Sequence, residues 1–347
     1  MSISACITSI SGPVLLTEER AFLRDAQPWG VILMGRSCVS KKQVRTLVSE
    51  MQMELGREAL IFIDQEGGRV ARLKSPEWPK FPAAATYGAL YEADSNAGIE
   101  ACRIGHQLMA RELSGLGIHA DCAPVGDLRQ STTHDAIGDR AFGFSVETVV
   151  ALAEAALEGL QAGGVAGCVK HMPGQGRAAV DSHHDLPRVE DDKTLLELDF
   201  SVFEGLAQKA PMGMTGHVSY DAIMPSEAAT VSKTIISEII RKRIGFDGLL
   251  MTDDLGMNAL GGNLAGRGAR ALAAGCDVLL HCSGFLSDPA QILAEMQDIA
   301  DAAGDLTGMA LERANRAEAC VSEPVPFDAE AGWARFETLM MQTQAGA

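Results

Sequence analysis

The amino-acid sequence predicts an α/β protein built as a single (β/α)8 barrel, known as a TIM barrel. Short β-rich runs alternate with longer stretches of helical spacing along nearly the whole chain, and eight such runs can be counted. Eight parallel strands close naturally into a barrel, whereas an open doubly wound sheet usually has fewer strands. With 347 residues, 47% of them hydrophobic, the chain can bury the core that a barrel needs.

The predicted strands are spaced so that a helix fits between successive pairs. Apolar residues recur on one face over 146–162, and Gly163 follows as a helix stop. Helices are also predicted over 97–116 and over 232–244, the latter ended by Gly245. The eight predicted strands span 4–11, 30–35, 60–64, 118–124, 165–171, 212–217, 249–253 and 277–281.

No convincing linker or short-period repeat divides the chain, so we expect residues 1–347 to form one domain. The tail over 324–347 contains Trp333, Phe336 and Leu339 and predicts a terminal helix that packs on the outside of the barrel.

Composition excludes several classes of partner. The formal net charge is −17, and the longest basic cluster is Lys41, Lys42 and Arg45, so nucleic acid and anionic membranes are not expected partners. No apolar run reaches membrane-spanning length, and residues 1–16 lack the features of a signal peptide. The eight cysteines form no C-x-x-C pair and predict buried free thiols in a reducing cytoplasm. A monomer is the default expectation.

Polar residues follow the predicted strands, at the end of a barrel where active sites lie. Asp64 ends the third strand, Lys170 and His171 the fifth, His217 the sixth, and Asp253 the seventh, where Asp254 follows. Taken singly, an acidic residue after a strand is often only a helix cap, and Asp254 could cap the following turn. Their convergence from four strand ends favours a functional site instead.

The stretch 170–187 contains a pattern suited to acid–base catalysis. Asp181 and His183 are two residues apart, so the carboxylate could orient the imidazole, which could then donate a proton to a leaving group and later accept one from water. A metal-dependent hydrolase is the alternative, because Asp181, His183, His184 and Asp185 are competent metal ligands. No other spacing in the chain completes a metal site, so neither a metal nor a cofactor is expected.

Four segments together resemble glycoside hydrolase family 3, and within it the bacterial β-N-acetylglucosaminidases of peptidoglycan recycling. They read I-F-I-D-Q-E-G-G-R-V over 61–70, I-G-D-R-A-F over 137–142, K-H-M-P-G-Q-G-R with D-S-H-H-D-L-P over 170–187, and G-L-L-M-T-D-D-L-G-M over 248–257. The four lie in order over more than half of the chain, which makes the resemblance specific. It implies a β-N-acetylhexosaminidase that removes terminal N-acetylglucosamine from saccharides or muropeptides derived from the cell wall.

The resemblance also implies roles for individual residues. Asp253 aligns with the nucleophile, His183 with the acid/base and Asp181 with its partner. The residues that align with those holding the sugar are Asp64, Arg72, Arg140, Lys170 and His171. Such a carboxylate nucleophile would form a glycosyl-enzyme that water hydrolyses with retention of configuration.

The departures from the family pattern are small. Thr252 stands where serine is common, and Gly256 stands where serine is often found. A third hypothesis, a saccharide-binding protein without turnover, conflicts with the presence of Asp181, His183 and Asp253 together.

Overall fold

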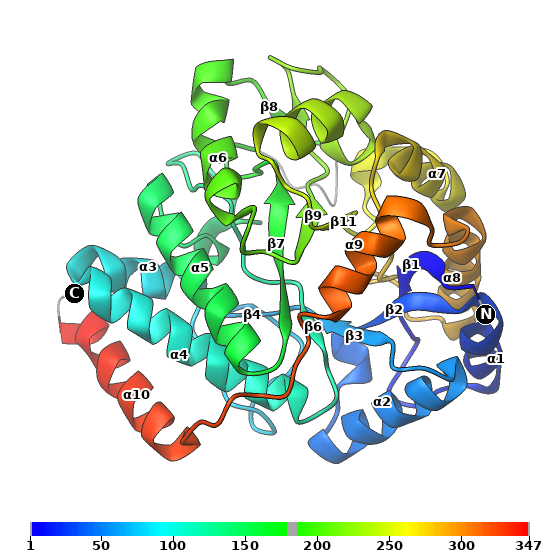
Figure 1. The fold of residues 1–347 in the computed structure, drawn as a ribbon, viewed down its shortest axis with the longest axis horizontal. Helices are drawn as coiled ribbons and strands as arrows, with labels where there is room; N and C mark the ends of the chain where they lie inside the picture. Colours follow the sequence, from blue (N-terminus) through cyan, green and yellow to red (C-terminus); the bar gives the residue numbers. More distant parts are fainter. Residues whose placement is uncertain (1, 179–185, 346–347) are drawn as a thin grey trace.

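Eight parallel strands form one sheet in the computed structural model, which describes residues 2–178 and 186–345. The strand order is β11-β9-β7-β6-β3-β2-β1-β12, and a parallel bridge between Met251 and Val278 joins the two ends. The sheet is therefore a nearly closed barrel, and helices surround it (Figure 1). The predicted (β/α)8 fold is confirmed. The barrel strands are β1 Ser4–Thr8, β2 Pro28–Leu33, β3 Leu60–Ile63, β6 Ala120–Asp121, β7 Ala166–Met172, β9 Met212–Thr215, β11 Leu249–Met251 and β12 Leu279–Leu280.

Each barrel strand lies within or overlaps one of the eight predicted runs. Their residues are buried on both faces, because one face fills the barrel and the other packs against helices. This double burial explains why β3 and β11 are continuous apolar runs rather than alternating ones. Two short sheets lie outside the barrel: β4 Gln65–Gly67 pairs antiparallel with β5 Val70–Ala71, and β8 Arg188–Val189 pairs parallel with β10 Ser219–Tyr220.

The helices begin at side-chain caps that are visible in the sequence. Ser145 accepts a hydrogen bond from the Thr148 amide and starts α5, and Asp288 caps α8 with Pro289 in its first turn. The α-helices are α1 Thr17–Ala26, α2 Lys41–Leu55, α3 Ala84–Ala93, α4 Ser95–Ser114, α5 Val146–Ala162, α6 Lys193–Leu206, α7 Leu264–Ala274, α8 Pro289–Ala303, α9 Gly308–Glu318 and α10 Ala329–Ala345. Short 3₁₀ turns are η1 Gly35–Ser37, η2 Gly138–Arg140, η3 Ala229–Val231 and η5 Asn258–Leu260.

The helix predicted over 232–244 differs in form. It is a π-helix, η4 Ile235–Arg243, with the wider i to i+5 hydrogen bonding. Residues five apart lie closer to one side of a π-helix than of an α-helix, and Ile235 and Ile240 are both buried. The wider winding therefore brings the two isoleucines toward one core-facing side.

Helix α10 packs on α3 and α4, at the outside of the barrel (Figure 1). Trp333 stacks on Phe81 with ring centroids 5.5 Å apart, and Phe336 meets Tyr87 at 6.4 Å. Among the described residues, no helix is long and apolar enough to cross a membrane.

Candidate active site

A hairpin after β3 returns the chain to the end of that strand. Asp64 follows β3 directly, and the buried Gln65 side chain holds the return strand by accepting hydrogen bonds from the amides of Arg72 at 2.9 Å and Leu73 at 3.0 Å. Gly67 has φ 92°, and a Cβ there would lie 2.3 Å from the Pro82 carbonyl oxygen, so the hairpin needs glycine. As a result, the Arg72 guanidinium donates to Asp64 at 3.0 Å.

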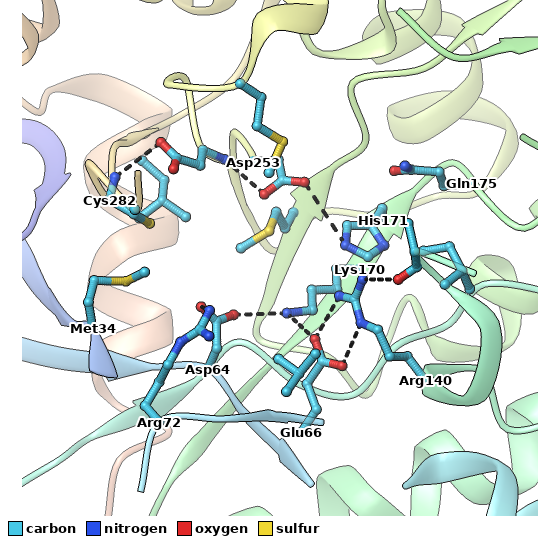
Figure 2. Close-up of a pocket in the computed structure, with 18 of the residues that line it drawn as sticks. Met34, Asp64, Glu66, Arg72, Arg140, Lys170, His171, Gln175, Asp253 and Cys282 are labelled. Atoms are coloured by element: carbon cyan, nitrogen blue, oxygen red, sulfur yellow. Dashed lines mark hydrogen bonds and ion pairs between the residues drawn. The ribbon is translucent and has the colours of Figure 1, made fainter. Parts of the chain in front are cut away.

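Lys170, near the end of β7, lies between two carboxylates. Its Nζ donates to Asp64 at 3.0 Å and lies 2.7 Å from Glu66, with only 3% of the lysine side chain exposed. On the other side of Glu66, Arg140 donates from two nitrogens to the two carboxylate oxygens, both at 2.8 Å. Two donors of one guanidinium thus pair with the two oxygens of one carboxylate, which adds both energy and geometric specificity. Together with Arg72, the cluster contains three cations and two anions (Figure 2).

The ionisation of this cluster follows from its mutual pairing. Burial by itself would raise the pKa of Glu66, but Arg140 and Lys170 outweigh it and hold that pKa far below its ordinary value. Burial would likewise lower the pKa of Lys170, but Glu66 and Asp64 raise it. The pKa of Asp64 is lowered for the same reason, by Lys170 and Arg72 against burial. All these groups are therefore charged at neutral pH, with one positive charge in excess.

Asp253 follows β11 by two residues and lines the same cavity. Its Oδ1 accepts a hydrogen bond from the Asp254 amide at 2.8 Å, and its Oδ2 lies 4.0 Å from Nε2 of His171. Figure 2 shows this carboxylate pointing toward the His171 ring. One oxygen is thus anchored by the backbone while the other faces the cavity, which suits a carboxylate that must react.

The His171 ring is held by a buried carboxylate. Its Nδ1 lies 2.6 Å from Oδ2 of Asp127, whose side chain is fully buried and also accepts from the Gln175 amide at 2.7 Å. Since an ionised carboxylate only accepts, the proton belongs on Nδ1 and Nε2 is left to face Asp253.

The cavity between these groups has a volume of about 350 Å³. Its lining consists of the charged cluster with Asp253 and His171 and of apolar side chains that include Met34, Met257 and Phe285. Such a mixed lining is typical of a small-molecule site in which a few polar groups fix the orientation of the ligand. A sugar, with hydroxyls at its edge and apolar ring faces, matches that arrangement.

The structure brings most of the predicted site residues together. One cavity is lined by Asp64, Arg72, Arg140, Lys170, His171 and Asp253. Asp181 and His183 lie outside the described residues, as do His184 and Asp185 of the metal hypothesis. Over 2–178 and 186–345, no group of three or more histidine, cysteine or acidic side chains is arranged to hold a metal ion. His217, which also ends a strand, does not line the cavity: its nitrogens contact Thr230 at 2.7 Å and the Asp254 carbonyl at 3.0 Å.

Sequence reasoning did not select three residues that hold the site together. Glu66 joins Lys170 to Arg140, Asp127 orients His171, and His281 holds the Asp254 carboxylate at 2.9 Å. Glu66 stands two residues after Asp64 and Asp127 follows the fourth predicted strand, so their positions at strand ends were a usable signal. Which side chains they contact was not visible, because each partner is far away in sequence.

Comparisons with known proteins agree on one family. Residues 10–316 match the family described as glycosyl hydrolase family 3 N-terminal domain. A β-hexosaminidase of Alkalilimnicola ehrlichii is 38% identical over 290 residues, covering 82% of each chain, and one of Bordetella avium is 34% identical over 283 residues, covering 80% of each. NagZ of Neisseria gonorrhoeae in complex with N-trifluoroacetyl-D-glucosamine superposes with a TM-score of 0.83 at 28% identity, covering 99% of this chain and 97% of that one.

Proposed function

The chain belongs to glycosyl hydrolase family 3 and is a β-N-acetylhexosaminidase, and from this premise we propose that it hydrolyses terminal, non-reducing β-linked N-acetylglucosamine with retention of configuration. The proposal rests on the position of the Asp253 carboxylate. One of its oxygens is anchored by a backbone amide, and the other faces a cavity lined by carboxylate and cationic side chains, which can bind the hydroxyls of a sugar. The Neisseria relative with an N-acylated glucosamine bound supports the substrate class.

In the proposed reaction, Oδ2 of Asp253 attacks the anomeric carbon as the bond to the leaving-group oxygen breaks. His183, oriented by Asp181, donates its proton to that oxygen, and both of these roles rest on the family resemblance. Water then attacks the glycosyl-enzyme while His183 takes a proton from it, which releases Asp253 and a sugar of retained configuration.

The charged cluster would bind the sugar hydroxyls. Each carboxylate oxygen of Asp64 has a second lone pair, so it can accept from a hydroxyl while paired with Lys170 and Arg72. The cations supply donors, and because they are already fixed by ion pairs they lose little freedom when the sugar binds. His171, held by Asp127, offers Nε2 at the side of the cavity nearest Asp253.

For the natural substrate we propose N-acetylglucosamine linked to anhydro-N-acetylmuramic acid, with or without peptide, as arises in peptidoglycan recycling. The enzyme would act in the cytoplasm as a monomer, with residues 1–347 as one catalytic domain and without a cofactor. A higher kcat/KM for this disaccharide than for N,N′-diacetylchitobiose would support the assignment, and the reverse order would contradict it.

The primary test of the proposed nucleophile is the variant Asp253→Asn. Because the amide cannot form the glycosyl-enzyme, we expect hydrolysis of an aryl β-N-acetylglucosaminide to fall by about 10³-fold or more. Proton NMR of the first product formed should show the β anomer, as retention requires. Wild-type activity should be selective over the matching β-glucoside and β-xyloside and should persist in chelator.

The matched control is Asp25→Asn, which removes the same charge from an exposed position on α1 and should leave the rate unchanged. An α anomer as first product would exclude retention. Loss of wild-type activity in chelator would instead favour the metal-dependent hydrolase that uses Asp181, His183, His184 and Asp185.

A further inference from the structure

Behind Asp253 lies a chain of polar contacts, running from buried His281 to partly exposed Glu295, that the proposed reaction does not use. His281 follows β12, and its side chain is 1% exposed. Its Nδ1 lies 2.9 Å from Oδ1 of Asp254, and its Nε2 lies 2.8 Å from Oε2 of Glu295 on α8. Ser283 donates to the same Glu295 oxygen at 2.9 Å. The imidazole is therefore held between two carboxylates that come from different elements of the barrel.

Contacts with carboxylates at both ring nitrogens are best satisfied by a doubly protonated ring, since carboxylates only accept hydrogen bonds. Burial would lower the pKa of His281, but the hydrogen bonds to Asp254 and Glu295 and the charges of the same two groups raise it to about 9. Two further cations interact electrostatically with these carboxylates: Arg36, from η1, with Asp254, and Arg267, from α7, with both Asp254 and Glu295. The ring is thus an imidazolium at neutral pH.

His281 contacts Asp254, the residue whose amide anchors the proposed nucleophile, Asp253. Besides His281, the Asp254 carboxylate accepts from the amides of Gly256 at 2.9 Å and Cys282 at 3.1 Å. The Asp254 carbonyl accepts from His217 at 3.0 Å. Asp254 is therefore fixed through its side chain and its backbone, and its own amide is the donor to Oδ1 of Asp253 at 2.8 Å.

We propose that His281, held by Glu295, is a positioning residue: its imidazolium clamps Asp254 and thereby sets the orientation of the Asp253 carboxylate. The inference rests on the proposed function, because it assumes that Asp253 reacts. A second consequence is electrostatic. Asp253 and Asp254 are adjacent acids, and the imidazolium compensates the negative charge of Asp254, which reduces its repulsion of the reacting Asp253 carboxylate.

A matched pair of variants on α8 tests the proposal. Glu295→Gln keeps a hydrogen-bond acceptor for His281 but removes one of its two carboxylates, whereas Asp298→Asn removes the same charge from an exposed position on the same helix. Glu295 does not line the cavity, so KM should be unchanged in both. The substrate should carry a leaving group that departs unprotonated, such as a dinitrophenolate, so that the high-pH limb of kcat does not report the catalytic acid.

For wild type and Asp298→Asn, we expect kcat to hold until His281 titrates near pH 9 and then to fall. Glu295→Gln should lose kcat about one pH unit earlier, with an unchanged value near pH 7. His281→Gln should lower kcat about 10- to 100-fold without changing KM, because a small misplacement of the nucleophile slows the chemical step. Superimposable profiles for wild type and Glu295→Gln in active proteins would overturn the inference.

A measurement on the unmodified protein covers the case in which a variant does not fold. The ¹⁵N shifts of the His281 ring at pH 7 should be those of an imidazolium, with both nitrogens protonated, and a neutral ring there would overturn the proposal. Failure of the proposed function is seen separately, as wild-type protein without activity on any N-acetylglucosaminide.

Discussion

Asp121, at the end of β6, is fully buried beside the charged cluster. Its Oδ1 accepts from the Gln65 amide at 2.9 Å, and its Oδ2 has no hydrogen-bond partner among the described residues. Burial raises the pKa of Asp121 to about 7, against the Gln65 amide and Lys170, which lower it. Lys170 is already shared by Asp64 and Glu66, so it cannot fully compensate a third carboxylate.

Because the pKa of Asp121 is raised, we expect this residue to destabilise the folded protein increasingly as the pH rises. Between pH 3.8, the ordinary pKa of an aspartate, and about pH 7, the unfolded chain has released this proton while the folded protein retains it, so the free energy of unfolding falls as pH rises through that window. Asp121→Asn, which cannot ionise, should match wild type near pH 4 and be more stable by roughly 1–4 kcal/mol at pH 8. Urea unfolding at the two pH values measures the difference, and an equal stability change at both would contradict it.

At the scale of elements, the ends of the barrel strands hold Asp64, Lys170 and Asp253, which line the cavity, and helices surround the strands. Helix α10 is an addition to that scheme, because it packs on α3 and α4 rather than on the sheet. Phe336 is 5% exposed and lies between Tyr87 of α3 and Trp333 of its own helix. These aromatic contacts and the ion pair between Arg335 and Glu100 of α4 attach this helix to the barrel.

Shortening the Phe336 side chain should lower the stability of the protein without affecting substrate binding. Phe336→Ala removes a buried aromatic ring and should lower the free energy of unfolding by about 3–5 kcal/mol, with KM unchanged because the residue does not line the cavity. Met341→Ala, on the same helix at an exposed position, is the control and should stay within about 0.5 kcal/mol of wild type. Equal stability of the two variants would show that α10 contributes little to the fold.

Over the whole molecule, all eight cysteines are free thiols, and the cysteine pattern predicted this. The predicted burial holds for six of them, whereas Cys38 and Cys320 are partly exposed. Burial raises the pKa of the inner thiols, for example that of Cys6 to about 12, and so suppresses the reactive thiolate. No covalent cross-link contributes to the barrel, whose stability comes from its core.

The rate of thiol alkylation tests whether six of the cysteines are buried and two are partly exposed. In native protein, iodoacetamide should label at most Cys38 and Cys320 in the time that labels all eight cysteines in denaturant. The Cys38→Ser, Cys320→Ser double variant should lose native labelling, as mass spectrometry can measure. Rapid native labelling of Cys168 or Cys122 would mean that the barrel core opens readily.

The sequence alone determined where the eight strands lie along the chain. Strands buried on both faces appear in the sequence as short apolar runs between segments of helical spacing. It also placed Asp64, Lys170 and Asp253 at strand ends, and the barrel brings all strand ends to one edge. Only the tertiary structure decided that Lys170 bridges Asp64 and Glu66. It likewise decided that His281 clamps Asp254 and that the helix over 232–244 winds as a π-helix. The two contacts depend on distances between residues far apart in the chain, which barrel closure and core packing set, and the winding of the helix depends on which of its side chains the core buries.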